Sequence, residues 1–293
     1  MTKTLLFGGS GFFGPVILSK DPNIISVGRT KPPSYCQNKH IQINDLNELN
    51  KLDCIEFDKV IFLIGSSNHH DININIDMGI DFNVYPLNKA LDYFSKKSLK
   101  KFICFTTILL YDQKKIVIPV DETQEINPFA NKYIFSKYLS EQIVKFYQSK
   151  VPSIIVRLSN IYGYTELRRP DLIPTIMQDV FEKEKVEIWS NKPKRDFIFT
   201  EDAADAVIRL LETDFTGILN LGSGKMSSLK LISEIIEDLS GKKIVSKNEV
   251  VSGPMEFNTN IKKISEITGW EPKFDIKKGL EKTFEIMRSY YSK

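Results

Sequence analysis

The sequence predicts an α/β fold, with a doubly wound parallel sheet followed by a smaller α/β C-terminal lobe. Three observations support this prediction. Short, uninterrupted apolar runs alternate with segments of helical periodicity through the first half of the chain. Gly8, Gly11 and Gly14 directly follow the first apolar run, and the regular alternation ends after Gly163. Apolar strands that alternate with helices are typical of a parallel sheet covered on both faces.

The strands of this sheet are expected, in chain order, at residues 4–7, 24–27, 41–43, 60–64, 102–106 and 153–158. The helices between them are expected at residues 14–20, 81–94 and 133–147. In the second of these helices, Val84, Leu87 and Leu91 recur at helical spacing.

Prolines punctuate the chain after residue 163, and the pattern becomes less regular. Here we expect helices at 171–184, 229–239 and 279–290, and a strand at 218–221. The predicted division is a first domain at 1–163 and a mainly separate lobe at 164–293, with some segments returning to the first domain.

The composition excludes several classes of protein. Hydrophobic residues make up 42% and charged residues 26% of the chain, which argues against disorder. The net charge of +3 is spread out, and pairs such as Lys96-Lys97 indicate solvated faces rather than a nucleic-acid patch. No run is long enough to cross a membrane, and no signal peptide is expected. The cysteines are too few and too irregularly spaced for disulfides or zinc, so we expect a cytoplasmic protein without a metal.

The three glycines form a G-x-x-G-x-x-G loop between the first strand and the first helix. Bare backbone N–H groups at a helix N-terminus bind a dinucleotide pyrophosphate. Gly8 allows the tight turn, Gly11 lets the backbone approach the phosphates, and Gly14 lets the helix pack on the strand. The first domain is therefore predicted to be a Rossmann domain, with Phe12 and Phe13 inside its cofactor loop.

The end of the second strand selects between the two nicotinamide dinucleotides. NAD-binding folds place an acidic residue there for the ribose 2′-hydroxyl, whereas NADP-binding folds place an arginine for the 2′-phosphate. This chain has Arg29, followed closely by Lys31, and no acid at the tip. Because a guanidinium binds phosphate through two hydrogen bonds, NADP(H) is favoured. NAD(H) remains possible, since Arg29 could instead stack on the adenine.

Tyr133 and Lys137 form a Y-x-x-x-K pair on one face of a predicted helix. The pKa of a free phenol is about 10, and a neighbouring ammonium lowers it by favouring the phenolate. The phenol can then exchange a proton with a substrate oxygen. Thr106 and Thr107 end the preceding strand, where a hydroxyl would hold that oxygen. With the glycine loop, these residues predict transfer of a hydride and a proton on a carbinol or ketone.

The chain resembles the extended short-chain dehydrogenase/reductases of the nucleotide-sugar epimerase/dehydratase/reductase group, and the resemblance runs nearly end to end. The motifs that carry it are the glycine loop, the Y-x-x-x-K pair and the segments 106–111, 157–163, 195–202, 220–224 and 269–272. The resemblance implies that Thr107, Tyr133 and Lys137 are catalytic.

The motifs and the resemblance together predict the binding residues. Those expected to bind the cofactor are Gly8, Gly11, Phe12, Phe13, Gly14, Arg29, Asp45, Leu46, Leu63, Gly65, Ser66, Asn83, Thr106, Tyr133 and Lys137. Those expected to bind a nucleotide-diphosphate sugar are His69, Thr107, Asn160, Leu172, Trp189 and Arg195. His69 is included because it follows the fourth strand at the end where ligands bind in doubly wound sheets.

Arg195 is the expected diphosphate partner, because a planar guanidinium suits phosphate. Its alternative role is a salt bridge to Asp196 or Asp202 between the two parts of the chain. The family often carries a further arginine before the C-terminal helix, but residues 253–260 contain none.

The residues after Thr107 narrow the reaction. Dehydratases of this group carry an Asp-Glu pair there, and related decarboxylases an acid nearby, but this chain has Ile108 and Leu109. Reductases with a built-in 3,5-epimerase activity need a cysteine at the position of Leu109 and a histidine, and no histidine follows His70. These three activities are therefore not expected.

Two reactions at C4 of a nucleotide-linked sugar remain. The favoured one is NADP(H)-dependent reduction of a 4-keto-(6-deoxy)hexose with Tyr133 as proton donor, because Arg29 indicates NADPH. The alternative is an NAD-dependent 4-epimerase or C4 dehydrogenase. A cofactor-binding regulatory relative is the non-enzymatic alternative, and the intact catalytic residues argue against it. No motif identifies the nucleotide or the sugar.

The resemblance also implies a homodimer, in which the helices at 83–94 and 133–147 pair with their mates in a four-helix bundle. Apolar Phe94, Tyr138 and Phe146 fit such a bundle and equally fit the core of a monomer.

Overall fold

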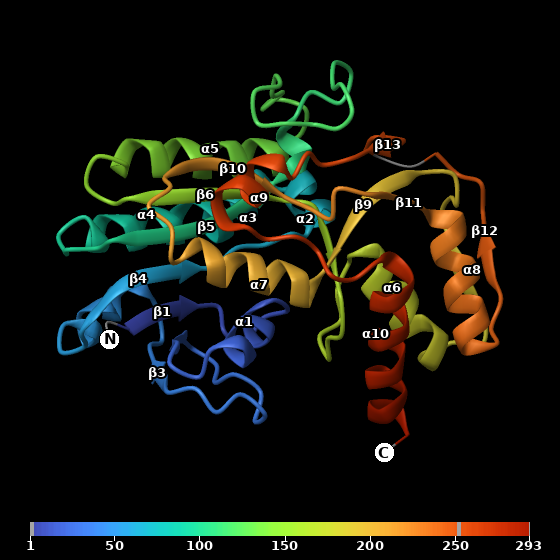
Figure 1. The fold of residues 1–293 in the computed structure, drawn as a ribbon, viewed down its shortest axis with the longest axis horizontal. Helices are drawn as coiled ribbons and strands as arrows, with labels where there is room; N and C mark the ends of the chain where they lie inside the picture. The colour runs from blue at the N-terminus through green and yellow to red at the C-terminus, as the bar shows by residue number, and fades with distance from the viewer. Residues whose placement is uncertain (1–2, 251–252, 293) are drawn as a thin grey trace.

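The computed structural model describes residues 3–250 and 253–292, and its largest element is a seven-stranded parallel sheet (Figure 1). The strands lie in the order β3-β2-β1-β4-β5-β6-β10, so the order reverses between β1 and β4. Their bounds are β1 (Lys3–Phe7), β2 (Ile25–Gly28), β3 (His40–Gln42), β4 (Phe57–Phe62), β5 (Lys101–Thr107), β6 (Ser153–Leu158) and β10 (Gly217–Leu221). The predicted doubly wound fold is confirmed.

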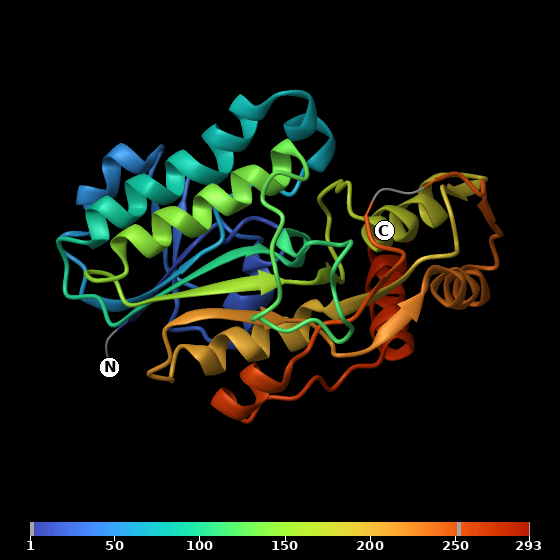
Figure 2. The same ribbon diagram turned by 90° about the horizontal axis from the view of Figure 1, so that it is seen from above.

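Helices cover both faces of this sheet (Figure 2). One face carries α1 (Gly14–Lys20), α7 (Thr200–Leu210) and α9 (Lys262–Thr268), and the other carries α4 (Tyr85–Phe94) and α5 (Lys132–Tyr147). Successive side chains of β1 alternate between them. Leu6 clusters with Ile17 and Val207, whereas Leu5 clusters with Leu91. Because both faces are buried, the strands are apolar along their length.

The helix predicted at 81–94 begins irregularly. Ile80–Val84 form a π-helical turn (η2), and α4 starts at Tyr85 with Pro86 in its first turn. Proline is tolerated there because the first N–H groups of a helix have no partner within it. Phe94 at its end is fully buried in the monomer core, whereas Phe146 on α5 is 78% exposed. Only Phe146 of this pair is therefore free to meet a partner.

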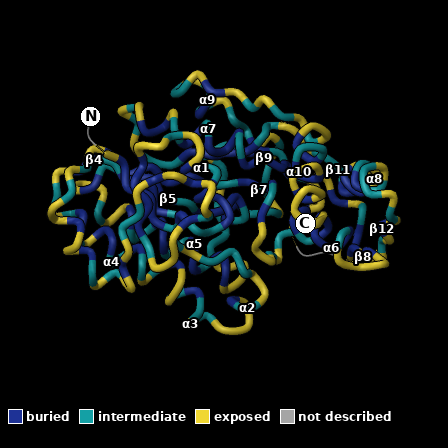
Figure 3. The backbone as a smooth tube through the Cα atoms, turned by 90° about the horizontal axis from the view of Figure 1, so that it is seen from below, coloured by how far each residue is buried: buried dark blue, intermediate teal, exposed yellow. Residues whose placement is uncertain are grey.

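Short helical segments occupy the loops that follow the strands. They are η1 (Leu46–Leu52), α2 (His69–Ile74), α3 (Ile76–Gly79) and η3 (Ile108–Leu110). α2 and α3 lie at the rim of the molecule beside α5 (Figure 3). They connect β4 to η2 and therefore stand next to the carboxyl ends of the central strands.

The C-terminal lobe lies beyond the carboxyl ends of the central strands, at the right of Figure 1. Its helices are α6 (Leu172–Glu182), α8 (Leu229–Ser240) and α10 (Ile276–Tyr291). Its strands are β7 (Asn160–Tyr162), β8 (Val186–Ile188), β9 (Lys194–Phe199), β11 (Met226–Ser228), β12 (Ile244–Ser246) and β13 (Glu256–Phe257). The lobe has its own core, in which Met177, Ile232 and Leu280 are fully buried.

Several segments after residue 163 belong to the first domain. β10 pairs with β6 at the edge of the large sheet, and α7 packs on α1. Trp270, which is 1% exposed, donates its indole N–H to the carbonyl of Asp202 over 3.1 Å. The carboxylate of Asp202 accepts the N–H groups of Lys273 and Phe274. These contacts hold the segment before α10 against α7.

Among the residues that the structure describes, no helix combines the length and apolar character that a membrane crossing needs.

Candidate active site

A cavity of about 1000 Å³ lies at the carboxyl ends of the central strands, between the large sheet and the C-terminal lobe. Its walls come from the glycine loop, the segment after β4, the end of β5, the first turn of α5, and the lobe. Ligands bind at this place in doubly wound sheets, where the strand order reverses. The volume is at the upper end of the usual range for a small-molecule site.

The glycine loop is shaped for close approach of a ligand. Gly8 has a φ of +88°, in the left-handed region that favours glycine, and its carbonyl accepts the N–H of Gly11 over 3.1 Å. A Cβ atom on Gly14 would lie 2.3 Å from the Gly8 carbonyl oxygen and 2.6 Å from the Cα of Gly9. Gly8, Gly11 and Gly14 all line the cavity. The bare backbone at the start of α1 therefore fits a dinucleotide pyrophosphate.

Thr107, Tyr133 and Lys137 converge on the same cavity although they come from two elements. Each is at most 8% exposed, and all three line the cavity wall. The hydroxyl of Thr107 accepts the N–H of Leu109 over 3.2 Å and lies close enough to the Tyr133 phenol to lower its pKa. The ammonium nitrogen of Lys137 lies 5.7 Å from the centre of the Tyr133 ring. The phenol, the hydroxyl and the ammonium thus stand together, as the motif predicted.

Burial dominates the acidity of these groups in the ligand-free chain. Desolvation, assisted by the negative charge of Asp171, raises the pKa of Tyr133 well above its usual value. The Thr107 hydroxyl and the Arg169 guanidinium lower it, but by less. Burial also lowers the pKa of Lys137 to about 8. The expectation that a neighbouring ammonium brings the pKa of the phenol down toward neutrality is therefore not met, because desolvation outweighs the groups that lower this pKa.

Asn83 lies behind the site rather than in its wall. Its side-chain oxygen accepts the ammonium of Lys137 over 3.0 Å and the N–H of Ser66 over 2.8 Å. Its amide nitrogen donates to the Ser136 hydroxyl over 3.0 Å. This buried amide therefore fixes Lys137 and the loop after β4, and its own contact with the cofactor stays a prediction.

Replacing Lys137 by methionine is expected to stabilise the cofactor-free protein by on the order of 2–3 kcal/mol at pH 7, while removing activity. The pKa of Lys137 falls from 10.5 in the unfolded chain to about 8 in the folded one. The cost of burying the ammonium is therefore complete below pH 8. As the pH rises from 8 to about 10.5, the native state loses its proton first and wild type gains stability.

Urea unfolding at pH 7 and pH 10 measures this effect, and the stability gap between variant and wild type should shrink at the higher pH. Lys145→Met is the control, because Lys145 is exposed on the same helix. A destabilised Lys137→Met protein at pH 7 would contradict the prediction.

Thr106 lines the cavity, but its hydroxyl is bound to a buried carboxylate. Its hydroxyl donates to the Glu141 carboxylate over 2.9 Å, and Arg157 binds the same carboxylate through two hydrogen bonds of 2.9 and 2.8 Å. The Arg157 guanidinium stacks on the Tyr111 ring, 4.9 Å from its centre. The Tyr111 hydroxyl donates to Asn220 over 2.7 Å. The Thr106 hydroxyl is thus engaged in a buried network, and contact between the rest of this cavity-lining residue and the cofactor stays a prediction.

The other predicted residues divide by position. Those that line the cavity are Phe12, Phe13, Leu63, Gly65, Ser66, His69, Asn160, Leu172, Trp189 and Arg195. Arg29, Asp45 and Leu46 follow β2 and β3 at the same edge of the sheet, outside the set of cavity-lining residues. Arg29 is exposed, and the Asp45 carboxylate caps η1 by accepting the N–H of Asn47. Their contacts to the adenosine end of a cofactor stay predictions.

Arg195 reaches the cavity from β9. Its Nε donates to the Pro254 carbonyl over 3.2 Å, and a Cβ on Gly253 would lie 3.4 Å from its guanidinium. The neighbouring carboxylate of Asp196 instead accepts the N–H groups of Ser223 and Gly224. Arg195 therefore lines the cavity as predicted, whereas the Asp196 carboxylate binds the backbone of the loop after β10.

The sequence prediction missed Arg169. This residue lies in the loop between β7 and α6 and lines the cavity. Its guanidinium stands 4.7 Å from the centre of the Phe12 ring and donates to Asp171 over 2.7 Å and to the Ser67 hydroxyl over 2.9 Å. Arg169 thus joins the C-terminal lobe to the glycine loop. Nothing in the run Arg168-Arg169-Pro170-Asp171 separates it from an ordinary charged loop.

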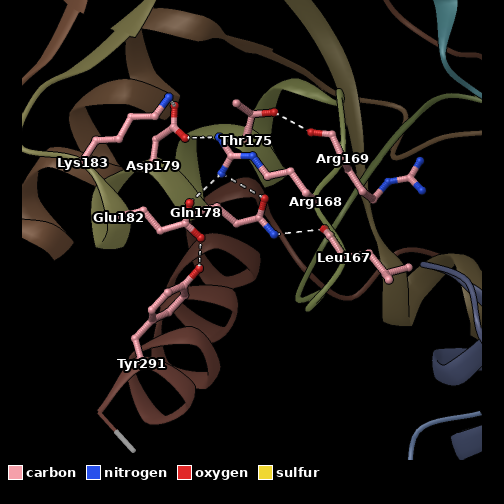
Figure 4. A network of polar contacts seen from close by, with 9 residues as sticks. All are labelled: Leu167, Arg168, Arg169, Thr175, Gln178, Asp179, Glu182, Lys183 and Tyr291. Carbon is pink, nitrogen blue, oxygen red and sulfur yellow. Dashed lines mark hydrogen bonds and ion pairs between the residues drawn. The ribbon is translucent and has the colours of Figure 1, made fainter.

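Arg168, its neighbour, faces the opposite way (Figure 4). It binds Asp179 and Glu182 on α6, and Glu182 in turn accepts the hydroxyl of Tyr291 at the end of α10. Arg168 therefore binds the loop to the lobe, and Arg169, the next residue, lines the cavity.

Among the described residues, no cluster of histidine, cysteine or carboxylate side chains has the geometry to hold a metal ion.

Comparison with known proteins identifies a family with this kind of site. The NAD dependent epimerase/dehydratase family matches residues 4–222. A putative UDP-glucose 4-epimerase of Methanocaldococcus jannaschii is 25% identical, over 97% of this chain and 98% of that protein. A UDP-glucose 4-epimerase of Thermotoga maritima, solved with UDP-glucose, has a similar fold with a TM-score of 0.89 at 20% identity, over 99% of both chains.

A UDP-glucuronic acid 4-epimerase of Bacillus cereus, solved with UDP-glucuronic acid and NAD, has a TM-score of 0.84 at 21% identity. The alignment covers 99% of this chain and 100% of that one. The family match spans most of the chain, and the site contains the glycine loop and the convergent tyrosine and lysine. The protein therefore belongs to the NAD-dependent epimerase/dehydratase family, within the extended short-chain dehydrogenase/reductases.

Proposed function

We propose that the protein is an NAD-dependent nucleotide-sugar 4-epimerase. The observation that carries the proposal is the convergence of Thr107, Tyr133 and Lys137 with the glycine loop on one cavity. The relatives described above are named as 4-epimerases, and one of them was solved with NAD. This favours the alternative reaction over the ketoreductase that the sequence first suggested.

Each residue of the site has a separate role in the proposed epimerisation at C4. Tyr133 takes the proton of the sugar hydroxyl at C4 and later returns it, and Thr107 holds the same oxygen through its own hydroxyl. Lys137, fixed by Asn83, provides positive charge beside the phenol and binds the cofactor ribose. The bound NAD would accept a hydride from C4 and give it back. Arg195 and Arg169 line the part of the cavity that would receive the sugar diphosphate.

The floor of the cavity argues against elimination of water from the sugar. Ile108 is 3% exposed and Leu109 also lines the cavity, directly after Thr107. Neither side chain can donate or accept a proton at C5 or C6. The chain therefore lacks the acid and base that a dehydratase of this family places there.

A 4-ketoreductase that uses NADPH is the second candidate, and Arg29 favours it. Arg29 follows β2 at the edge where the adenosine ribose binds in this fold, and the tip of that strand contains no carboxylate. A guanidinium there suits a 2′-phosphate. The two candidates share every catalytic residue and differ in whether reducing equivalents are consumed.

The deciding experiment supplies the protein with NAD+ and UDP-glucose, UDP-N-acetylglucosamine or UDP-glucuronic acid, and follows the C4 epimer by NMR. A 4-epimerase forms the epimer from at least one of them without net NADH formation, and it keeps a deuterium label placed at C4. In a parallel reaction, NADPH is supplied with a nucleotide-linked 4-keto-6-deoxy sugar. Oxidation of NADPH there, with no epimer in the first assay, would replace the proposal by the reductase.

The homodimer and the cytoplasmic location stay predictions. The exposed Phe82, Tyr85 and Phe146 on the η2, α4 and α5 face are compatible with a helix-paired dimer.

A further inference from the structure

His69 stacks directly on the catalytic tyrosine. The centres of the His69 and Tyr133 rings are 3.9 Å apart, and their planes are inclined by only 17°. His69 is the first residue of α2, whose N-cap Asn68 accepts the N–H of Asp71. The imidazole therefore covers one face of the phenol from an element that follows β4.

The same short helix also holds the backbone of Tyr133. The side-chain oxygen of Asn73 accepts the Tyr133 N–H over 3.0 Å, and Lys132 donates to the Ile74 carbonyl over 2.8 Å. Ile72 joins Tyr133 in a small apolar cluster. α2 thus contacts the first turn of α5 through its backbone, its apolar side chain and its leading ring.

We propose that His69 is a positioning residue, whose ring fixes the orientation of the Tyr133 phenol and keeps water from its covered face. The inference rests on the proposed function in so far as Tyr133 is the acid and base. It differs from the role expected from the sequence, in which His69 binds the sugar.

The charges around the two rings fit this role. Burial lowers the pKa of His69, Lys137 and Arg195 lower it further, and Asp171 opposes them. The imidazole is therefore neutral at neutral pH, and it can lie on the phenol without adding a charge. Around Tyr133, Thr107 and Arg169 favour the phenolate and Asp171 opposes it, and the ammonium of Lys137 lies 5.7 Å from the ring centre.

The test compares His69→Ala, which removes the ring, with His69→Phe, which keeps a ring but no nitrogen. His69→Ala is expected to lower kcat by about 10- to 100-fold and to change KM for the sugar nucleotide by less than about threefold. His69→Phe is expected to restore most of kcat. Asp77→Ala is the control, because Asp77 is exposed on the neighbouring α3 and is not among the cavity-lining residues.

Two outcomes would overturn the proposal. An equal loss of kcat in His69→Phe and His69→Ala would assign the role to a ring nitrogen. A raised KM with an unchanged kcat in His69→Ala would make His69 a substrate contact. In addition, the pH limb of kcat/KM that reports the phenol should move to lower pH in His69→Ala only, because water then reaches the buried phenol.

A further measurement does not depend on turnover. The unfolding equilibria of His69→Ala, Tyr133→Leu and the double variant form a mutant cycle, in which the stack should appear as a two- to tenfold coupling, about the range for aromatic pairs. If the effects of the two single variants were additive, the two rings would not interact energetically, and the inference would fail. A clear coupling in a protein that turns over none of the sugar nucleotides would instead refute the proposed function alone.

Discussion

Replacing Tyr133 by phenylalanine is expected to lower kcat by about 10²- to 10⁴-fold, the usual contribution of a general acid and base. The change removes only the phenol hydroxyl, whose pKa the neighbouring Thr107 lowers. The ring stays in place, so its stacking with His69 and its packing beside Ile72 and Ile134 are kept. Turnover should therefore collapse while the protein folds normally and NAD binds with an affinity within about tenfold of wild type.

Steady-state kinetics and cofactor titration by fluorescence measure the two quantities separately. Tyr138→Phe is the matched control, because Tyr138 lies on the same helix and is only partly buried. Its kcat should be unchanged. A Tyr133→Phe enzyme with nearly normal kcat would show that another group carries the proton, and the assignment of the site would fail.

Replacing Arg157 by methionine is expected to lower the free energy of unfolding by about 3–5 kcal/mol. Arg157 and Glu141 are both buried, with side-chain exposures of 4% and 0%. Without the guanidinium, the Glu141 carboxylate would keep only the hydroxyl of Thr106 among these partners. A buried charge that has lost its counter-ion is costly, and the Tyr111 ring would lose its stacking partner as well.

Urea unfolding gives the change in free energy, and the double variant Arg157→Met/Glu141→Leu separates charge from packing. We expect the double variant to be more stable than Arg157→Met alone, because no unpaired carboxylate remains. Lys96→Met is the control, since its ion pair with Asp92 is exposed and should contribute less than about 1 kcal/mol. An Arg157→Met protein as stable as wild type would contradict the prediction.

The large sheet could be predicted because its strands are buried on both faces. Each of the six strands expected before residue 163 is present, with its ends displaced by three and two residues at Val60–Ile64 and by at most one residue elsewhere. The strands of the C-terminal lobe were harder to predict from the sequence. β11 and β12 each have three residues and β13 has two, too few to show a period-2 pattern. The segment 195–202 was recognised only as a family motif, and neither the strand β9 nor the helix α7 was predicted there.

The convergence of Tyr133 and Lys137, the proposed catalytic pair, could be predicted because a short spacing on one helix encodes their geometry. Arg169 could not, since its role depends on how the loop after β7 folds back onto Phe12 and Ser67. Asn83 and Thr106 were placed near the site, but their hydrogen bonds to Lys137 and Glu141 could not be predicted from the sequence. A motif locates a side chain on an element, whereas the atom that it contacts follows from packing across elements.

The path of the chain has a consequence for dissecting the protein. After β6 the chain enters the lobe, returns for α7 and β10, leaves again for α8 and comes back for α9 before it ends in α10. A fragment that stops at residue 163 would lack the edge strand and two of the three helices on one face of the large sheet, which would leave Leu6, Ile103 and Ile154 open to water. A fragment that starts at 164 would carry an edge strand and two helices with nothing to pack against. We therefore expect the two halves to be insoluble when they are expressed apart. An active enzyme reassembled from two fragments would need the chain to be cut inside a surface loop of the lobe, rather than at the predicted border at residue 163.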